Sequence, residues 1–224
     1  MKKIAVIVAG GKGERMNLNI PKQFMVLNGK PLLYYTLKTF LEAYEDMQII
    51  LVLPEEYIDN GKEIIDGFFD SARIQITTGG RTRFHSVQNG LELIQDEAVI
   101  FVHDGVRCLL TKDLIRRCYD AALEAGSAVP VISCKDSMRM ITEDGNEMID
   151  REILKLVQTP QTFHSKILIP AFQIDYKDKF TDEATVVEAF GLKVQLIDGE
   201  DQNIKITTPV DAVMAEKILN EGNY

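Results

Sequence analysis

A glycine-rich turn near the N-terminus is the first stretch of the chain whose residue types could do chemistry. It reads Ala9-Gly10-Gly11-Lys12-Gly13-Glu14-Arg15-Met16 and is followed by Pro21-Lys22-Gln23. Glycines after a buried strand let backbone N–H groups approach a phosphate closely. Lys12, Arg15 and Lys22 add three positive charges within a short stretch. The combination favours a polyanion site over the alternative, a packing turn with incidental surface charges.

Two better-known phosphate motifs do not fit this turn. A Walker A loop needs Gly-Lys-Ser/Thr at a fixed distance from its first glycine, and no register supplies it. The dinucleotide pattern G-x-G-x-x-G can begin at Gly11, but its last position is then Met16. The remaining pattern, G-G-x-G-x-R-M followed by P-K-Q, resembles the signature of the nucleotidyltransferases that make activated sugar and alcohol phosphates.

The elements that position the turn alternate between strands and helices. Residues 4–8 just before it have the length and β-branching of a buried strand. Further strands are expected at 48–53, 73–78, 99–102, 128–133 and 193–197, and helices at 32–41, 55–69, 81–94, 112–125, 166–174, 180–190 and from 208 onward. This alternation predicts an α/β fold in one domain, 1–224, with a mostly parallel, Rossmann-like sheet flanked by helices.

Two later strand ends carry residues that could meet a ligand. Gly79-Gly80 leads into a helix that contains Ser86, so backbone N–H groups are expected to be available there. Strand 99–102 ends in His103-Asp104-Gly105-Val106-Arg107. Ligands of open α/β sheets bind at the carboxyl ends of strands. Asp104 is therefore expected either to meet a ligand or its metal, or to serve as a turn residue.

The alternation breaks between residues 135 and 150. Two short segments, 137–142 and 147–150, flank Asp144-Gly145, which is a hairpin turn signal. We therefore expect a β-arm over residues 135–157 that leaves the main sheet. A two-stranded hairpin is at best marginally stable alone, so the arm should pack on something, often a second subunit.

Composition limits the classes of protein to which the chain can belong. Its formal net charge of -9 disfavours a nucleic-acid partner, which needs a broad basic face. It shows no run of apolar residues long enough to span a membrane and no secretory signal, so we expect a cytoplasmic protein with no membrane partner. Cys108, Cys118 and Cys134 lack C-x-x-C spacing, and neither a disulfide framework nor a protein-built metal site is expected.

Several separated segments together resemble one family. Besides the glycine turn with Pro21-Lys22-Gln23 they are Gly79-Gly80 with Arg83 and Ser86, His103-Asp104-x-x-Arg107, Asp150-Arg151, Thr159-Pro160-Gln161, Thr181-Asp182-Glu183-Ala184 and Asn203-Ile204-Lys205-Ile206-Thr207. In this order they resemble the 2-C-methyl-D-erythritol 4-phosphate cytidylyltransferases of the non-mevalonate isoprenoid pathway. The resemblance runs from Ile4 to the last helix. It implies the nucleotide-diphospho-sugar transferase type of fold and a homodimer formed through the arm.

The resemblance also implies an activity and a set of site residues. The activity is transfer of CMP from CTP to methylerythritol phosphate with release of pyrophosphate, and Mg²⁺ is bound mainly through the CTP phosphates. Residues implied in catalysis are Arg15, Lys22, Arg151 and Lys205. Residues implied at CTP are Ala9, Gly10, Gly11, Gly13, Lys22, Gly80, Ser86, Asp104 and Gly105. Residues implied at the acceptor are Asp104, Arg107, Arg151, Thr159, Thr181 and Lys205, with Arg151 and Thr159 supplied by the neighbouring subunit.

This residue set suits the chemistry. The nucleophile would be an oxygen of a phosphate monoester, whose second pKa of roughly 6 leaves it ionised at neutral pH. No general base is then required, in agreement with histidines that form no triad pattern. The difficulty is that one anion attacks another, so cations must neutralise and align both. Magnesium keeps most of its ligands from water and phosphate, so one protein carboxylate or none is enough.

Two positions depart from the family, and two other functions stay open. Cys108 stands where the family usually has proline, so we expect a looser turn around Arg107. Arg81 stands where some relatives carry an acidic residue near the cytosine. Lys205, between Ile204 and Ile206, could also lie on a solvated strand face. A ribitol 5-phosphate cytidylyltransferase, or a non-catalytic nucleotide sensor, would share most CTP-facing motifs.

Overall fold

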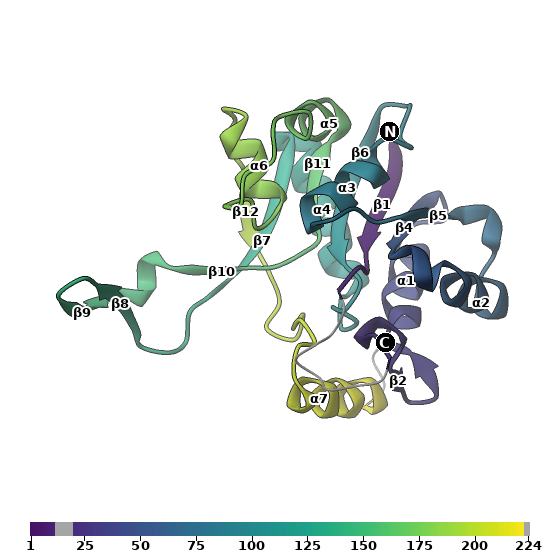
Figure 1. Cartoon of the computed structure of the whole chain (residues 1–224), viewed down its shortest axis with the longest axis horizontal. Coiled ribbons are helices and arrows are strands. Elements are labelled where there is room, and N and C mark those ends of the chain that lie inside the picture. Colours follow the sequence, from purple (N-terminus) through teal and green to yellow (C-terminus); the bar gives the residue numbers. More distant parts are fainter. Residues whose placement is uncertain (12–19, 222–224) are drawn as a thin grey trace.

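The computed structural model describes residues 1–11 and 20–221. Within these residues a central sheet of eight strands has the order β10-β7-β11-β6-β1-β4-β5, and β12 also pairs with β7 (Figure 1). The strands are β1 (Lys2–Val8), β4 (Met47–Leu53), β5 (Ile74–Thr78), β6 (Ala98–Asp104), β7 (Ser127–Ser133), β10 (Lys155–Val157), β11 (Gln161–His164) and β12 (Leu196–Asp198).

Most neighbouring strands run in parallel, as the alternating pattern predicts. β1 is parallel to β4 and β6, β5 to β4, and β12 to β7. The exceptions are β10, antiparallel to β7, and β11, which is inserted antiparallel between β6 and β7. We did not expect a strand at β11, because a buried four-residue segment after Pro160 shows no alternation of apolar and polar residues.

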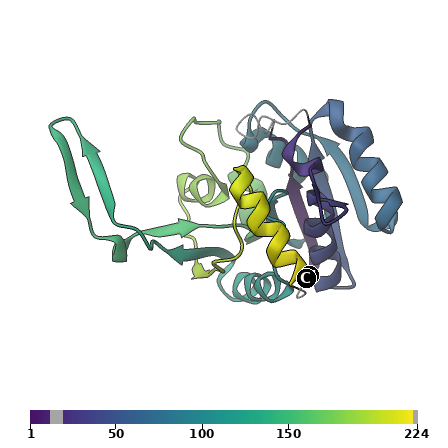
Figure 2. The same ribbon diagram turned by 90° about the horizontal axis from the view of Figure 1, so that it is seen from below.

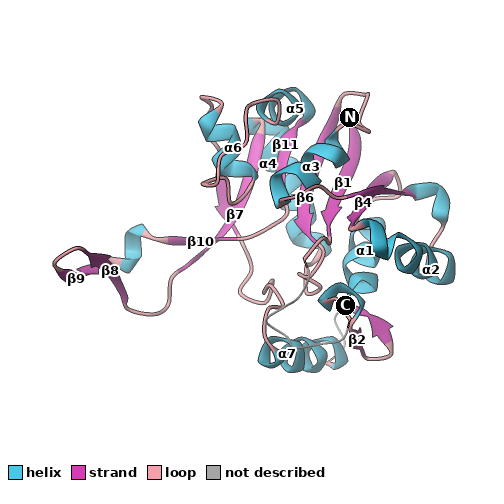
Figure 3. Ribbon diagram, in the orientation of Figure 1, coloured by secondary structure: helices cyan, strands magenta, loops and turns pink. Residues whose placement is uncertain are grey.

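Helices cover both faces of the sheet (Figure 3). They are α1 (Leu32–Ala43), α2 (Ile58–Phe68), α3 (Arg83–Leu91), α4 (Lys112–Ala125), α5 (Ser165–Ala171), α6 (Glu183–Ala189) and α7 (Pro209–Asn220). Side chains of α1, α2 and α4 form one buried apolar cluster with the sheet, and side chains of α3, α5 and α6 form a second cluster. Successive side chains of β1 point to opposite faces of the sheet, so β1 contributes to both clusters. Ala5 and Ile7 belong to the first cluster, and Ile4 and Val6 belong to the second.

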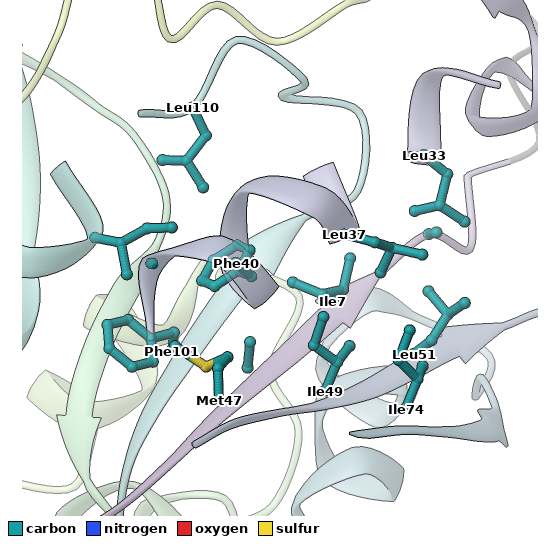
Figure 4. Close-up of a cluster of buried hydrophobic side chains, with 14 of the residues drawn as sticks. Ile7, Leu33, Leu37, Phe40, Met47, Ile49, Leu51, Ile74, Phe101 and Leu110 are labelled. Carbon is teal, nitrogen blue, oxygen red and sulfur yellow. The ribbon is translucent and has the colours of Figure 1, made fainter. Parts of the chain in front are cut away.

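The first cluster fixes α1 on the sheet. Figure 4 shows Phe40 and Leu37 of α1 beside Ile7 of β1 and Phe101 of β6. Phe40 and Phe101 are fully buried, with ring centroids 6.0 Å apart and ring planes inclined at 69°. Such edge-on aromatic pairs add to the stabilisation from apolar burial. The carboxyl ends of β1 and β6 are therefore held in place by a well-packed core.

Helix boundaries follow local signals where those signals are strong. The Thr111 hydroxyl accepts from Leu114 N at 3.0 Å and begins α4. Thr208 and Asp211 form a capping box at α7, as the Thr-Pro-Val-Asp sequence predicts. Gly191, with φ +95°, ends α6. Without such signals the predicted bounds were wrong by a few residues: 55–57 and 71–73 are 3₁₀ turns, α5 stops at Ala171, and β12 begins three residues late.

Two short hairpins lie outside the central sheet. Asn28 and Gly29, both at positive φ, connect β2 (Val26–Leu27) to β3 (Lys30–Pro31). The arm contains β8 (Met138–Thr142) and β9 (Gly145–Ile149), which pair with each other in a separate two-stranded sheet. Figures 1 and 2 both show this arm projecting far from the body of the molecule. The predicted β-arm is thus present, with its turn at 143–144, one residue earlier than expected.

No helix in the described ranges is long and apolar enough to cross a membrane.

Candidate functional site

The site lies at the carboxyl ends of β1 and β6, where the direction of strand succession reverses. From β1 the chain continues to β4 and β5 on one side, whereas β6 lies on the other side of β1. Residues 9–11 after β1 and residues 105–107 after β6 lie at this switch point, the usual ligand site of open α/β sheets. A cavity of about 370 Å³ occupies it. Its described lining is Val8, Ala9, Gly10, Gly11, Lys22, Gln23, Arg81, Thr82, Arg83, Ser86, Asp104, Val106 and Lys205.

A smaller cavity of about 180 Å³ adjoins the first. Its described lining is Arg83, Asp104, Arg107, Val157, Gln158, Thr159, Gln161, Thr181, Asp182 and Lys205. Arg83, Asp104 and Lys205 line both cavities and so form their common wall. Most residues predicted at CTP line the larger cavity, and most residues predicted at the acceptor line the smaller one. The structure therefore brings the two predicted sets together side by side.

Asp104, the last residue of β6, is the charge centre of this wall. Its carboxylate lies 3.2 Å from Arg83 Nε, 3.0 Å from Lys205 Nζ and 3.6 Å from Arg107 Nε. Burial alone would raise the pKa of Asp104, but the three cations overcome it and hold that pKa well below its usual range. Asp104 is thus an ionised anchor for cations. Lys205 lines both cavities with a side chain that is 44% exposed, and it lies outside the strands.

Arg83 has a second carboxylate partner, Glu183, the first residue of α6. The two Nη atoms of Arg83 donate to the two carboxylate oxygens of Glu183, with Nη2 3.1 Å from Oε2. The Glu183 side chain is 1% exposed. Burial opposes the charge of Arg83, but Glu183 and Asp104 more than offset it, and the pKa of Arg83 is raised. Arg83 therefore stays charged in a fixed orientation between two anions.

His103 and Thr159 form a buried hydrogen-bonded chain behind Asp104. His103 Nε2 lies 3.3 Å from the Arg107 carbonyl, which can only accept, so Nε2 carries the hydrogen. Nδ1 then accepts from the Thr159 hydroxyl at 2.9 Å, and that hydroxyl accepts from Asp104 N at 3.1 Å. Burial lowers the pKa of His103 to about 3, so the ring is neutral.

The hydrogen bonds of Thr159 correct one expectation. Thr159 was expected to reach the acceptor of a neighbouring subunit, but it is 4% exposed and bonded to His103 and Asp104 of its own chain. It lines the smaller cavity of that same chain. Thr159 is not part of the arm: it lies two residues before β11, which returns to the middle of the sheet.

The turn that carries Arg107 is held firmly despite Cys108. Arg107 N donates to Asp104 O at 3.0 Å, and Arg107 Nη1 donates to the Asn203 carbonyl at 2.8 Å. Cys108 is 1% exposed and packs among apolar residues from β2, α1 and α7. The expected loosening is therefore absent, because hydrogen bonds and packing replace the rigidity of a proline ring.

Lys22 lines the larger cavity together with Asp104 and Lys205. Its Nζ donates to the Ile206 carbonyl at 3.2 Å, one residue beyond Lys205. The neighbouring Gln23 is 1% exposed and donates to the Ala9 carbonyl at 2.6 Å, which ties this segment to the end of β1. Two cations from distant parts of the chain, Lys22 and Lys205, thus line one cavity.

The predicted glycine and serine positions divide into two groups. Gly10 and Gly11 line the larger cavity, and a Cβ on Gly10 would lie 3.9 Å from Ser86 Oγ. Gly80 and Gly105 are not among the described lining residues. Gly80 N donates to Ser86 Oγ, and a Cβ there would lie 2.4 Å from His85 Cβ. A Cβ on Gly105 would lie 2.9 Å from Ala9 Cβ. These two glycines shape the turns that carry the lining residues.

Three further predicted residues are Gly13, Arg15 and Arg151. Gly13 and Arg15 lie outside the described residues. Arg151 is exposed in a 3₁₀ turn at the base of the arm, where Nη1 donates to the Lys135 carbonyl at 2.8 Å. It lines neither cavity of its own chain.

The described lining residues do not supply a protein-built metal site. Their carboxylates are Asp104, whose oxygens face three cations, and Asp182, whose oxygens accept from Gln161 Nε2 and Thr185 N. Across the described residues no three His, Cys, Asp or Glu side chains are grouped to hold a metal ion. This donor set is compatible with a magnesium ion that enters on the phosphates of a nucleotide.

Comparison with known proteins identifies the family. The family model described as IspD, 2-C-methyl-D-erythritol 4-phosphate cytidylyltransferase, matches residues 3–221. The chain belongs to this family. A relative of that name from Bacteroides fragilis is 45% identical over 98% of this chain and 100% of its own length. One from Porphyromonas gingivalis is 41% identical over 97% of this chain and 98% of its own length.

Solved structures agree with this assignment. The 4-diphosphocytidyl-2C-methyl-D-erythritol synthase of Anaerococcus prevotii superposes with a TM-score of 0.83 at 27% identity, covering 98% of this chain and 99% of that one. The 2-C-methyl-D-erythritol 4-phosphate cytidylyltransferase of Francisella tularensis gives a TM-score of 0.81 at 28% identity, covering 97% and 99%. The predicted family and fold are thus confirmed.

Sequence reasoning gave no role to Arg83 and Glu183, which both belong to the motifs quoted for the family. A signal was present for Glu183: it follows a helix cap, Asp182, and precedes the apolar residues of a short helix. A carboxylate on the buried side of such a helix needs a cation. Its partner is 100 residues away in sequence, so no local pattern identifies Arg83.

Proposed function

We propose that this protein transfers CMP from CTP to 2-C-methyl-D-erythritol 4-phosphate. An oxygen of the acceptor phosphate attacks the α-phosphorus of CTP, and the bond from that phosphorus to the β-phosphate oxygen breaks. The products are 4-diphosphocytidyl-2-C-methyl-D-erythritol and pyrophosphate. Family membership over residues 3–221 supports the assignment of both substrates.

One observation within the structure carries the proposal. Two adjoining cavities share a wall made of Arg83, Asp104 and Lys205. A triphosphate in the larger cavity and a phosphate monoester in the smaller one would meet at this wall. Its two cations would reduce the repulsion between the nucleophile and the phosphoryl group it attacks.

The proposed roles of individual residues follow from their positions. Gly10, Gly11 and Ser86 would lie along the nucleotide, and Lys22 would neutralise charge on its phosphates. Arg107, Thr181 and Lys205 would hold the acceptor. Asp104 would keep Lys205 and Arg107 aimed at the cavities. Arg15 retains the transition-state role that the family implies.

Magnesium is proposed to enter with CTP as part of the substrate. A bound ion would offset negative charge on the triphosphate and steady its conformation. Removing the metal with EDTA should stop product formation, and restoring Mg²⁺ should recover it. Activity that survives complete chelation would contradict this part of the proposal.

We further propose that the protein works as a homodimer in the cytoplasm. Met140, Ile141, Met148 and Ile153 of the arm are 44%, 81%, 70% and 76% exposed, an apolar surface that a second subunit would cover. Arg151, remote from its own cavities, would then reach those of the partner. The three free cysteines are compatible with a reducing compartment.

An acceptor assay tests the function directly. Purified protein is incubated with Mg²⁺ and CTP, either alone or with methylerythritol phosphate or ribitol 5-phosphate, and pyrophosphate release is followed with product identification by mass spectrometry. We expect release with methylerythritol phosphate only. Release with ribitol 5-phosphate at a higher kcat/KM would favour the other cytidylyltransferase. CTP binding without release under any condition would favour a nucleotide sensor.

A further inference from the structure

The pair formed by Arg83 and Glu183 connects the two sides of the site. Arg83 is the first residue of α3, the helix that carries Ser86 into the larger cavity. Glu183 is the first residue of α6 and follows Thr181 and Asp182, which line the smaller cavity. One ion pair therefore links the helix on the nucleotide side to the helix on the acceptor side.

The hydrogen bonds of Arg83 restrict its orientation. Both Nη atoms donate to Glu183, and Nε donates to Asp104 Oδ1 at 3.2 Å, so all three nitrogens of the planar guanidinium are engaged. A bidentate contact of this type fixes direction as well as position. Asp104 in turn contacts Lys205 and Arg107, so the orientation of Arg83 affects the whole set of wall cations.

Glu183 itself is held in place by its own surroundings. It is fully buried, and its neighbours at the start of α6 are fixed by a capping box between Asp182 and Thr185. Gln161 of β11 accepts from Ala184 N at 2.8 Å and donates to Asp182 at 2.9 Å. The start of α6, which carries Glu183, is thus attached to the central sheet by hydrogen bonds to β11.

We propose that Glu183 is a positioning residue that acts through Arg83. It holds the guanidinium of Arg83 at the wall between the cavities, where this positive charge reduces the repulsion between the two substrates. Glu183 lines neither cavity, and its carboxylate oxygens are occupied by Arg83. Without its negative charge, Arg83 would be free to turn toward substrate phosphates in the ground state. Substrates would still bind, but the reacting groups would be misaligned.

This inference depends on the proposed function, and the two can fail separately. If the wild-type protein does not transfer CMP to methylerythritol phosphate, the proposed function fails. If the wild type is active, Glu183→Gln tests the positioning role, because glutamine keeps the shape of the side chain and removes the charge. We expect kcat to fall by about 10- to 100-fold, the scale of a small misplacement at a reacting centre. The KM for CTP should change by less than about threefold.

Three controls separate positioning from a structural role. Glu188→Gln changes an exposed glutamate on the same helix and should leave kcat unchanged. Calorimetric CTP binding should show one site per subunit in Glu183→Gln. In an Arg83→Gln background, adding Glu183→Gln should lower kcat no further, because Glu183 acts through Arg83.

Several results would overturn the proposal. One is an unchanged kcat in Glu183→Gln. Another is that Glu183→Gln lowers kcat in the Arg83→Gln background by the same factor as in the wild type. The third is that the fall in kcat equals the fall in the fraction of protein that binds CTP. If Glu183→Gln does not fold, Glu183→Asp keeps the charge and withdraws the carboxylate by one carbon. An Asp variant with normal CTP binding and lowered kcat would support positioning, and one with normal kcat would exclude it.

Discussion

At the scale of single residues, the site depends on ionised groups that hold one another in place. Asp104 stays charged because three cations surround it, and Arg83 stays charged because two carboxylates flank it. Removing one partner of such a buried set leaves an uncompensated charge, which costs more than the pair contributes. Variants that keep shape while removing charge are therefore the most informative.

Lys205→Met tests the assignment of the acceptor side. Methionine keeps much of the length of lysine but removes its charge and its three donors. Loss of a charged hydrogen bond of about 1.5–3 kcal/mol should lower kcat/KM for the acceptor by about 10- to 150-fold. The calorimetric Kd for CTP should stay close to that of the wild type. Lys193→Met, at an exposed position, is the matched control. Unaltered acceptor kinetics would remove Lys205 from the phosphate pocket.

His103 should make the protein less stable as the pH is lowered. Its pKa is about 3 in the native state, because of burial, and about 6.5 in the unfolded chain. Between these values the unfolded chain binds a proton that the native state does not. The free energy of unfolding therefore falls with decreasing pH, by about 1.4 kcal/mol per pH unit. The pKa of Asp104 is lowered in the native state, so Asp104 also makes the free energy of unfolding fall with decreasing pH, but only below about pH 4.

Urea unfolding at a series of pH values between 4 and 7 checks this expectation. His103→Gln should be less stable than the wild type at pH 7 and should show a flatter dependence on pH. His85→Gln, at a less buried position, should keep most of the wild-type slope. Parallel slopes for His103→Gln and the wild type would mean that His103 is already protonated in the native state.

At the scale of elements, α3 is placed by close packing against the sheet. Its Gly90 faces β1 and β4, and a Cβ there would lie 2.7 Å from Val6 Cγ1 and 3.2 Å from Val52 Cγ2. The two valines are fully buried and stiff at χ1. The residue at this position therefore determines how near Arg83 and Ser86 of α3 lie to the strand ends.

Gly90→Ala should destabilise the protein even though alanine favours helix by about 1 kcal/mol. Overpacking against two rigid valines should lower the free energy of unfolding by about 1–3 kcal/mol. Gly67→Ala is the matched control, because Gly67 also lies in a helix and a Cβ there meets nothing within 4 Å. It should be neutral or stabilising. Thermal and urea unfolding measure both, and a stabilised Gly90→Ala would contradict the packing argument.

At the scale of the whole molecule, the arm is the feature that a single subunit does not explain. It extends away from the body in two perpendicular views (Figures 1 and 2). Several of its apolar side chains are exposed. Arg151 at its base lies on the surface, 49% exposed in its side chain. The proposed homodimer accounts for both observations, because the partner would cover the apolar side chains and receive Arg151.

Mixing two inactive variants tests this arrangement. Lys22→Ala lacks a body residue and Arg151→Ala an arm residue, so a hybrid dimer would contain one site with both residues intact. Random exchange of equal amounts makes half of the dimers hybrid, and about a quarter of all sites should then be active. The measurement is CMP transfer after subunit exchange, with hybrid formation confirmed by native mass spectrometry. Hybrids no more active than either parent would exclude a shared site.

The sequence by itself determined the features that depend on neighbouring residues. Thr111, Thr208 and Gly191 mark helix ends because caps act within one turn. The hairpin of the arm is predicted by Asp144-Gly145, a turn signal between two short segments, and β8 and β9 confirm it. Ordered motifs also identified the family, since each motif keeps its residues at fixed spacing.

The tertiary structure decided what depends on residues far apart in the chain. β11 is a strand because β6 and β7 lie on either side of it, and four buried residues give no sign of this alone. Thr159 joins its own cavity because the chain returns to the middle of the sheet at that point. Arg83 meets Glu183 across 100 residues because the folded chain brings the first residues of α3 and α6 together. A buried charge requires an opposite charge, but only the folded chain determines which residue supplies it.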